Sequence, residues 1–563
     1  MNILKKIILA SAALLACAFS ANAAEAKAPE KVVVAYVTSW TDEIPDPSHM
    51  THINYAFGHV NDSFNGVRVD NPDRLRSIVA LKKQNPALKV LVSVGGWGSG
   101  RFSEMAADPK NRKAFANSCK KLVKDFNLDG IDIDWEYPTS SAAGISSSPA
   151  DTDNFSALMH DLRKALGKNK ILSLATIASG EYIDFPAFID VVDLVNTMTY
   201  DMGNPPYLHN GLFPSENTRW MSSDQGVKAH LAKGVPAEKL VMGVPFYGRG
   251  HRQAMRDHRG IHRWDSKAMT PYVALADSLA FGYENVRSMS HKCRYINENN
   301  LRGAMYWDYA SDGITHKLAN TVKNMILDGR DFNSGTRRVV ILSENAGQHK
   351  PFVDAAIKWL IDESALWNMQ IQIFTNANYL ADKNLIDSTD LIIQLDFPPY
   401  TWNEQAKANF IEYINEGHGA WIGFHHATLL GDFDGWPMWN WFSDFMGGIT
   451  FKNYIAPLAD GTVNVEAPAH PVMDGVAPSF VLADDEWYTY DRSPRPNVDV
   501  IASVDESTYS PASDVKMGDH PVVWSNPDVK AKNVYFQMGH SPRLFDSPDF
   551  CRMFRNALEW ALY

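Results

Sequence analysis

The ten residues from Asp129 to Pro138, DGIDIDWEYP, constrain the fold and chemistry of this chain more than any other stretch. Side chains of a β-strand alternate between two faces. On one face this strand would carry Ile131, Ile133 and Trp135. On the other it would carry Asp132, Asp134 and Glu136, with neighbouring carboxylates about 6 to 7 Å apart. An apolar face opposite three consecutive acids predicts a buried strand whose acidic side has a function.

Three like charges on one buried face repel one another unless protons or hydrogen bonds relieve the repulsion. If Asp132 and Asp134 share a proton, and if the Asp134 carboxyl also interacts with that of Glu136, the pKa of Glu136 rises. It then approaches the range in which Glu136 protonates a leaving group. The alternatives are a solvated strand edge and a calcium-binding loop. Calcium loops interpose Gly, Asn and irregular turns, whereas Ile, Ile and Trp intervene here, so the pattern favours a catalytic acid.

Residues 29–330 alternate short apolar stretches with longer helical patterns, which is typical of an α/β fold of the (β/α)8 TIM-barrel type. The expected strands are Val32–Val37, His52–Phe57, Val90–Val94, Gly130–Glu136, Ile171–Ile177, Leu194–Thr199, Leu240–Phe246 and Gly303–Asp308. Between Tyr247 and Trp307 the sequence reads as a loop followed by a helix through Glu284–Asn299. In such barrels the chemistry takes place at the carboxyl ends of the strands.

The acidic stretch resembles the DGxDxDxE signature of glycoside hydrolase family 18, the chitinases and their relatives, whose four acids would be Asp129, Asp132, Asp134 and Glu136. Ser93-Val94-Gly95-Gly96 and Met198-Thr199-Tyr200-Asp201 are similar to the family's SxGG and MxYD patterns. The resemblance implies retaining, substrate-assisted hydrolysis of β-1,4-linked N-acetylglucosamine polymers. It implies that Glu136 is the proton donor, that Asp134 stabilises the substrate acetamide, that Asp132 tunes Asp134 and that Tyr200 binds the acetamide carbonyl.

Side chains at the strand ends are expected to contact the sugar, and the resemblance places Trp307 under the cleaved residue; a core-filling role is the alternative for this indole. The expected substrate-binding residues are Tyr36, Phe57, Trp97, Tyr137, Met198, Asp201, Tyr247, Arg249 and Trp307. Gly95 and Gly96 are expected to make room inside the barrel. The partner would be an N-acetylglucosamine-containing polysaccharide or glycan. Two alternatives stay open: an endo-β-N-acetylglucosaminidase acting on N-glycans, and a non-catalytic chitin-binding lectin.

Residues 331–337 contain Gly, Asp, Asn and Ser and are expected to form a linker. From 338 to 563 the pattern is in outline that of a doubly wound, flavodoxin-like α/β domain, with an irregular region from Trp436 to Val481. Gly423-Phe424-His425-His426-Ala427, Asp485-Glu486-Trp487-Tyr488 and Gly539-His540 resemble the ThuA-like (trehalose-utilisation) family, a relative of class I glutamine amidotransferases. Those enzymes need a Cys after the central strand. The stretch Phe424-His425-His426 has none, which excludes glutaminase activity.

Several polar residues of the second domain fall at expected strand ends. They are His349, His425, His426, Glu486 and His540. Imidazole and carboxylate suit zinc, but histidines at strand ends are often only hydrogen-bonded in place. These residues are therefore weak candidates for a metal site, and the sequence leads us to expect no metal and no cofactor.

The chain has 563 residues, too many for one compact core, which fits two domains. Residues 1–23 read as a signal peptide that ends in Ala21-Asn22-Ala23, with Ala24 as the mature start. This predicts a secreted or periplasmic protein without a membrane span; the rival is a lipid anchor through Cys17. A net charge of −12 without a basic run argues against nucleic-acid partners. The remaining cysteines, Cys119, Cys293 and Cys551, indicate neither a disulfide framework nor a zinc knuckle, and the sequence sets no oligomeric state.

Overall fold

The computed structural model describes residues 30–256, 260–331, 335–344, 347–433 and 435–563. The expected signal peptide, with Cys17 and Ala24, lies outside the described residues. Within them, no helix has both the length and the hydropathy needed to cross a membrane. All three described cysteines are free and buried.

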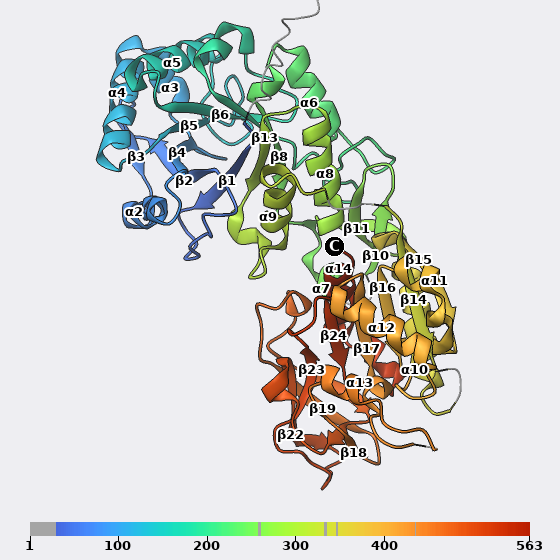
Figure 1. Ribbon diagram of the computed structural model, residues 1–563. Coiled ribbons are helices and arrows are strands. Elements are labelled where there is room, and N and C mark those ends of the chain that lie inside the picture. Colours follow the sequence, from blue (N-terminus) through green and yellow to red (C-terminus); the bar gives the residue numbers. More distant parts are fainter. Residues whose placement is uncertain (1–29, 257–259, 332–334, 345–346, 434) are drawn as a thin grey trace, which may run out of the picture.

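Eight parallel strands close into a barrel, because β1 pairs with both β2 and β13 (Figure 1). In order around the barrel they are β1 (Val32–Thr38), β2 (His52–Val60), β4 (Lys89–Gly95), β5 (Gly130–Asp134), β6 (Ile171–Ile177), β7 (Leu194–Met198), β8 (Leu240–Pro245) and β13 (Gly303–Trp307). A short strand, β3 (Val67–Val69), pairs with the end of β2. The predicted TIM barrel is confirmed, and each expected strand overlaps an observed one. β5 ends two residues earlier than expected, so Glu136 lies just beyond the strand.

Helices surround the barrel and bury their apolar sides on it. They are α2 (Pro72–Ala80), α3 (Phe102–Ala107), α4 (Pro109–Asp125), α5 (Asp151–Leu166), α6 (Ser223–Ala232), α8 (Val286–Glu298) and α9 (Lys317–Val322). In α4, Phe115, Cys119 and Val123 recur every four residues and are buried, which is the spacing of one helix face. Ile131 and Ile133 of β5 belong to the core between strands and helices. Because these isoleucines alternate with Asp132 and Asp134 along the strand, the two aspartate side chains point into the barrel.

An antiparallel sheet interrupts the barrel between β8 and α8, so the expectation of only a loop before the helix is wrong. It contains β9 (Arg249–Gly250), β10 (Ile261–Asp265), β11 (Thr270–Leu275) and β12 (Ser278–Gly282), in the order β10-β11-β12-β9, and α7 (Arg252–Arg256) follows β9. The turn from β11 to β12 passes through Ala276 and Asp277, both at positive φ (46° and 64°). Tight hairpins of this kind usually carry Asn-Gly or Asp-Gly, so the sequence lacked the usual hairpin signal.

The second domain is built on a nine-stranded mixed sheet. Its parallel part has the order β15 (Met369–Phe374), β14 (Arg337–Ser343), β16 (Leu391–Leu395), β17 (Ala420–Phe424) and β24 (Asn533–Phe536). This is the 2-1-3-4-5 order of flavodoxin-like sheets. Antiparallel strands β23 (Pro521–Ser525), β22 (Asp499–Ser510), β19 (Ala459–Val465) and β20 (Ser479–Asp485) extend it. The helices include α10 (Lys350–Trp367), α11 (Lys383–Asp387), α12 (Glu404–Glu416) and α14 (Pro548–Leu562).

The stretch from Trp436 to Val481 is more regular than expected, which corrects the sequence interpretation. It holds α13 (Asn440–Phe445), β18 (Phe451–Tyr454), β19 and the start of β20, and β18 pairs with β21 (Tyr488–Tyr490). In β19, buried and half-buried residues alternate along the polar sequence ADGTVNV. A strand with so few apolar residues gives a weak pattern in the sequence.

The inserted sheet, α8 and α9 contact the second domain (Figure 1). Trp264 of β10 packs against the second core, and the Arg287 guanidinium lies 3.9 Å from the centre of its ring. Arg287 also donates to the carbonyls of Ala365 and Leu366, at 2.8 Å each. Lys317 of α9 pairs with Glu559 of α14 at 2.8 Å. The last residue of the expected linker, Arg337, is the first residue of β14.

Candidate active site

Asp132 lies inside the barrel with its side chain closed off from solvent. Four donors from four other strands surround its carboxylate: Tyr36 Oη at 2.8 Å, Ser93 Oγ at 2.7 Å, Ser173 Oγ at 2.6 Å and Asn196 Nδ2 at 3.3 Å. Burial raises the pKa of Asp132, and these hydrogen bonds oppose the rise. The barrel therefore holds this carboxylate in one fixed position.

Asp134 is also buried, and its Oδ1 has no hydrogen-bond partner among the described residues. Burial, followed by the charges of Glu136 and Asp132, raises its pKa well above the usual value. No described hydrogen bond joins Asp134 to Asp132. The four donors around Asp132 take the place of the shared proton that the sequence suggested.

Glu136 follows β5 directly. Burial is the main cause that raises its pKa to about 7, and the charge of Asp201 adds to the rise, while a hydrogen bond from Tyr137 opposes it. A carboxylic acid with such a pKa is half protonated near neutral pH and is able to donate a proton there. The fourth acid of the motif, Asp129, lies at the opposite end of β5, where it accepts a hydrogen bond from Val90 N at 2.8 Å and pairs with Lys82.

The residues after β7 form a second polar group at the barrel mouth. Tyr200 is buried and its Oη lies 3.7 Å from Met305 Sδ, and Met198 packs in the same cluster. Asp201 accepts a hydrogen bond from Tyr247 Oη at 2.7 Å and pairs with Arg249. Burial works against ionisation of Asp201, but its bonds to His209, Arg249 and Tyr247 bring its pKa down to about 2.

Trp307, at the end of β13, lies among aromatic rings. Its ring centre is 5.6 Å from that of Phe57, nearly parallel at 19°, and 6.4 Å from that of Trp40. Tyr36 is 5.5 Å from Trp307 but only 1% exposed, and its hydroxyl is bound to Asp132. Its position therefore corrects the expectation that Tyr36 contacts the sugar, because its hydroxyl is used to hold Asp132.

A second aromatic group lies in the loops after β4, β5 and β6. Trp97 is 63% exposed, with its ring 6.4 Å from that of Tyr137, and Tyr137 stacks on Tyr182 at 5.7 Å. The glycines before Trp97 make room, as expected. A Cβ on Gly95 would lie 1.9 Å from the carbonyl oxygen of Asp134, and one on Gly96 would lie 2.7 Å from the Phe57 ring.

Sequence reasoning missed several residues of this region. His209 is buried with Nδ1 3.7 Å from Asp201, and Trp40 is 63% exposed beside Phe57 and Trp307. Both lie in loops outside the strands. Trp40 could have been found from its place two residues after β1, where an exposed indole is unusual. His209 carries no such signal.

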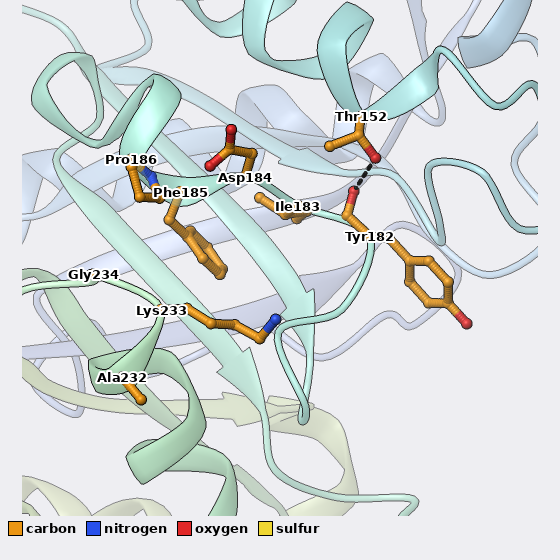
Figure 2. Close-up of a pocket in the computed structure, with 9 residues that line it drawn as sticks. All are labelled: Thr152, Tyr182, Ile183, Asp184, Phe185, Pro186, Ala232, Lys233 and Gly234. Atoms are coloured by element: carbon orange, nitrogen blue, oxygen red, sulfur yellow. Dashed lines mark hydrogen bonds between the residues drawn. The ribbon is translucent and has the colours of Figure 1, made fainter.

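Two cavities lie near the barrel mouth. One, of about 590 Å³, lies between the loop after β6 and the end of α6, where Thr152 Oγ1 donates to the Tyr182 carbonyl at 2.9 Å (Figure 2). Its lining shares only Tyr182 with the aromatic group beside Glu136. The other, of about 800 Å³, lies between the two domains and reaches Tyr247 and Gly248 from the side of α14.

The candidates of the second domain also come together. His349, Glu486 and His540 have ligand atoms within 4.8 Å of one another, as do His349, His425 and His426. Glu486 Oε2 is 3.2 Å from His425 Nε2. The structure thus brings all five residues into one group at the carboxyl ends of the parallel strands of the second sheet.

Comparisons with known proteins match both domains. Residues 32–312 match the profile of the family described as Glycosyl hydrolases family 18, and residues 338–561 match that described as Trehalose utilisation. Chitinase A1 of Niallia circulans is 28% identical over 414 residues, which cover 52% of this chain and 58% of that enzyme. Chitotriosidase-1 of Mus musculus is 28% identical over 353 residues, 51% of this chain and 75% of that protein.

Among solved structures, the Group IV chitinase of Ostrinia furnacalis in complex with allosamidin aligns with a TM-score of 0.49 and 28% identity. The alignment covers 53% of this chain and 100% of that one. Each of these three relatives aligns with only about half of this chain.

Proposed function

Residues 32–312 belong to glycosyl hydrolase family 18 and residues 338–561 to the trehalose-utilisation family, and from this premise we propose that the chain is a chitinase-type glycosidase. Its substrate is a β-1,4-linked N-acetylglucosamine polymer, hydrolysed with retention of configuration. The observation that carries the proposal is the environment of Glu136, an acid with a pKa of about 7 at the mouth of a closed barrel, beside a second buried acid. The names of the chitinase relatives support the choice of substrate.

In the proposed mechanism the substrate supplies its own nucleophile. The carbonyl oxygen of the N-acetyl group attacks the anomeric carbon while Glu136 gives its proton to the glycosidic oxygen. The bond to the leaving sugar breaks, and the new bond from the acetamide oxygen closes an oxazolinium ring. Asp134 faces the acetamide nitrogen as that group becomes positively charged, since a carboxylate at this place stabilises developing cationic charge. Water then opens the oxazolinium, and Glu136 takes up a proton as base.

The surrounding residues position this chemistry. Tyr200 binds the acetamide carbonyl from the wall formed after β7, and Asp132, held by four hydrogen bonds, keeps β5 and Asp134 in register. Trp307, stacked near Phe57, offers an apolar face to the pyranose ring. Met198, Asp201, Tyr247, Arg249, Trp97 and Tyr137 line the rest of the site.

A second candidate is the release of N-glycans by an endo-β-N-acetylglucosaminidase, which the same acids would support. The exposed aromatic rings of Trp40, after β1, and Trp97, after β4, favour an extended sugar chain. A non-catalytic lectin is disfavoured because Glu136 is present with a pKa suited to proton donation.

We also propose that the signal peptide directs export of the protein, because chitin is an extracellular polymer. The mature protein is expected to begin at Ala24. Mass spectrometry of the protein from medium, periplasm and membrane of an expressing bacterium distinguishes this from a lipid-modified Cys17 at the amino terminus.

The decisive experiment is product analysis on chitooligosaccharides by wild type and Glu136→Gln. Loss of the general acid is expected to lower kcat by about 10² to 10⁴, with substrate binding kept. The matched control is Glu298→Gln, which changes an exposed glutamate on α8 in the same way and is expected to leave kcat unchanged. Equal kcat in wild type and Glu136→Gln would refute the mechanism, and release of N-glycans without cleavage of chitooligosaccharides would favour the second candidate.

A further inference from the structure

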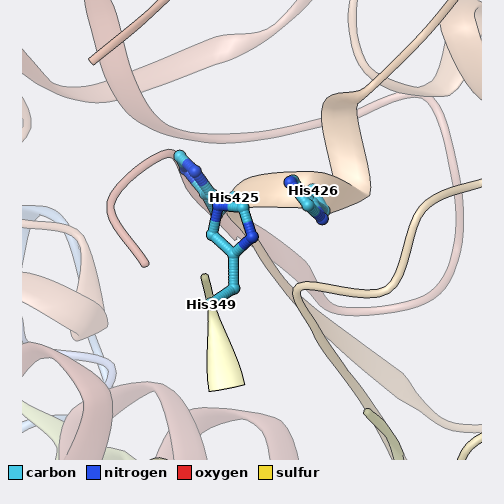
Figure 3. Close-up of side chains that lie close together, drawn as sticks. All are labelled: His349, His425 and His426. Carbon is cyan, nitrogen blue, oxygen red and sulfur yellow. The ribbon is translucent and has the colours of Figure 1, made fainter. Parts of the chain in front are cut away.

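Four imidazoles and one carboxylate meet at the carboxyl end of the parallel strands in the second domain. His349 precedes α10, His425 and His426 follow β17, and His540 follows β24. The ring of His349 is the centre of the group, 4.0 Å from the His426 ring, 4.6 Å from His540 and 5.1 Å from His425 (Figure 3). Glu486, after β20, completes it. Open α/β sheets bind their ligands at this edge.

The hydrogen bonds of two of these rings fix where their protons lie. His425 Nδ1 is 2.8 Å from the carbonyl oxygen of Gln537, which only accepts, so Nδ1 carries the proton. His426 Nδ1 lies 2.7 Å from Glu344 Oε2 and 3.1 Å from the carbonyl oxygen of Asp396, and it must donate as well. Each neutral ring therefore presents an unprotonated Nε2. Histidines that ligate metals make this kind of bond to a carbonyl or carboxylate with their other nitrogen.

The unprotonated Nε2 of His425 faces a carboxylate oxygen that also only accepts. His425 Nε2 is 3.2 Å from Glu486 Oε2, and His349 Nε2 is 3.8 Å from the same oxygen and has no hydrogen-bond partner among the described residues. Two acceptors turned towards each other are unfavourable unless a cation lies between them.

A further buried acid beside the group lacks partners. Asp396 is fully buried, and neither carboxylate oxygen has a hydrogen-bond partner among the described residues. Its backbone carbonyl accepts the proton of His426, and a Cβ added to Gly539 would lie between His425 Cβ and Asp396 Oδ1, at 2.7 and 3.0 Å. Buried polar groups without a partner are rare and often indicate an ion or water.

We propose that His349, His425, His426, Glu486 and His540 form a binding site for one divalent transition-metal ion of the zinc type. Imidazole nitrogens with one carboxylate are the ligand set that such ions prefer over magnesium or calcium, which favour oxygen. His349 belongs to both groups of donors with ligand atoms within 4.8 Å, so the ion lies next to this ring. The partly exposed side chains of His349 and His426, 13% and 12%, give the ion access from solvent.

The test uses the full chain after removal of metal with a chelator. The protein is incubated with zinc sulfate, desalted, and its zinc content measured by inductively coupled plasma mass spectrometry. Wild type is expected to keep about one zinc ion per chain, while His349→Ala and His426→Ala each lose at least about tenfold in affinity. The control is His418→Ala, which removes an exposed imidazole of the same domain and is expected to bind as wild type does.

Cobalt(II) gives a second readout, because ligation by imidazole and carboxylate in a four- or five-coordinate site produces a visible absorption band that hexaaqua cobalt lacks. The His540→Gln variant, which keeps a side chain of similar polarity, is measured in the same way. Far-UV circular dichroism and thermal unfolding of each variant report on its fold. The proposal is overturned if wild type retains less than about 0.1 zinc per chain, or if folded His349→Ala and His426→Ala bind zinc as tightly as wild type.

Discussion

Glu136 acquires its pKa mainly from burial and in part from the charge of Asp201. A general acid acts in its protonated form, which is abundant below the pKa and is lost above it. We therefore expect kcat/KM to fall about tenfold per pH unit above a pH of about 7. The measurement is a pH–rate profile on a soluble chitooligosaccharide.

The contribution of Asp201 is tested by Asp201→Asn. Removal of a negative charge makes ionisation of Glu136 easier, so its pKa falls and the alkaline limb of the profile moves to lower pH. The activity itself also falls, because Arg249 and Tyr247 lose their partner, but the position of the limb reports on Glu136 alone. Asp190→Asn, at an exposed acid of the barrel, is the control with an unchanged limb, and a limb that moves upward in Asp201→Asn would contradict this account.

The acids of β5 could be predicted because a period of two places them on one face, whatever the rest of the chain does. Other site residues depend on contacts between distant parts of the chain. Asp201, in the loop after β7, and Arg249, at the start of β9, pair although they are 48 positions apart, and His209 lies beside Asp201 in a loop whose sequence has no periodicity. The function of Tyr36 was misjudged for the same reason, since only the closed barrel brings its hydroxyl to Asp132.

At the scale of elements, the buried ion pair between Lys292 and Glu284 stabilises the packing of α8 on the barrel. Both side chains are fully buried, and Lys292 Nζ also donates to the Asn210 carbonyl at 2.6 Å in the loop after β7. Breaking a buried pair by removing one partner leaves an uncompensated charge. Lys292→Met is therefore expected to lower the free energy of unfolding by about 3–5 kcal/mol, measured by urea denaturation.

The control is Lys228→Met on α6, where the lysine of the pair with Asp224 is 70% exposed. Exposed pairs contribute about 0–1 kcal/mol, so this variant is expected to remain close to wild type. A Glu284→Gln/Lys292→Met double variant should recover part of the loss, since it leaves no buried charge. Equal stability of Lys292→Met and Lys228→Met would refute the role of the buried pair.

The strands of the barrel and strands β14, β16, β17 and β24 of the second sheet were predictable because they are continuous apolar runs buried on both sides. The strands that were missed have weaker patterns. β15 is an edge strand whose residues are at most half-buried, and β19 has polar residues or glycine at four of its seven positions. β9 has only two residues, which pair with β12. Tertiary pairing, rather than local preference, makes these segments strands.

At the scale of the whole molecule, Lys317 joins the two domains by contacting Asp474 at 3.0 Å and Glu559 at 2.8 Å. Glu559 also accepts from the backbone nitrogen of Val286 at the start of α8, at 2.9 Å. Removal of the lysine leaves two acids facing each other across the interface. We expect Lys317→Met to separate the unfolding of the domains into two transitions in calorimetry.

Lys323→Met is the matched control. Its side chain is as exposed as that of Lys317, 27% in each case, but its partner Asp328 belongs to the same domain. It is expected to keep the calorimetric profile of wild type. If Lys317→Met unfolds in the same way as Lys323→Met, the interface does not depend on this bridge.

The five residues of β5 serve both folding and activity, because one face of the strand packs in the core and the other carries the acids. Adding or deleting one residue within Gly130–Asp134 would turn the carboxylates outward against the helices and the isoleucines into the lumen, because a shift by one inverts both faces of a strand. Length changes in this strand are therefore excluded for any descendant of the gene that stays active, whereas the loops around the mouth are free to vary in length.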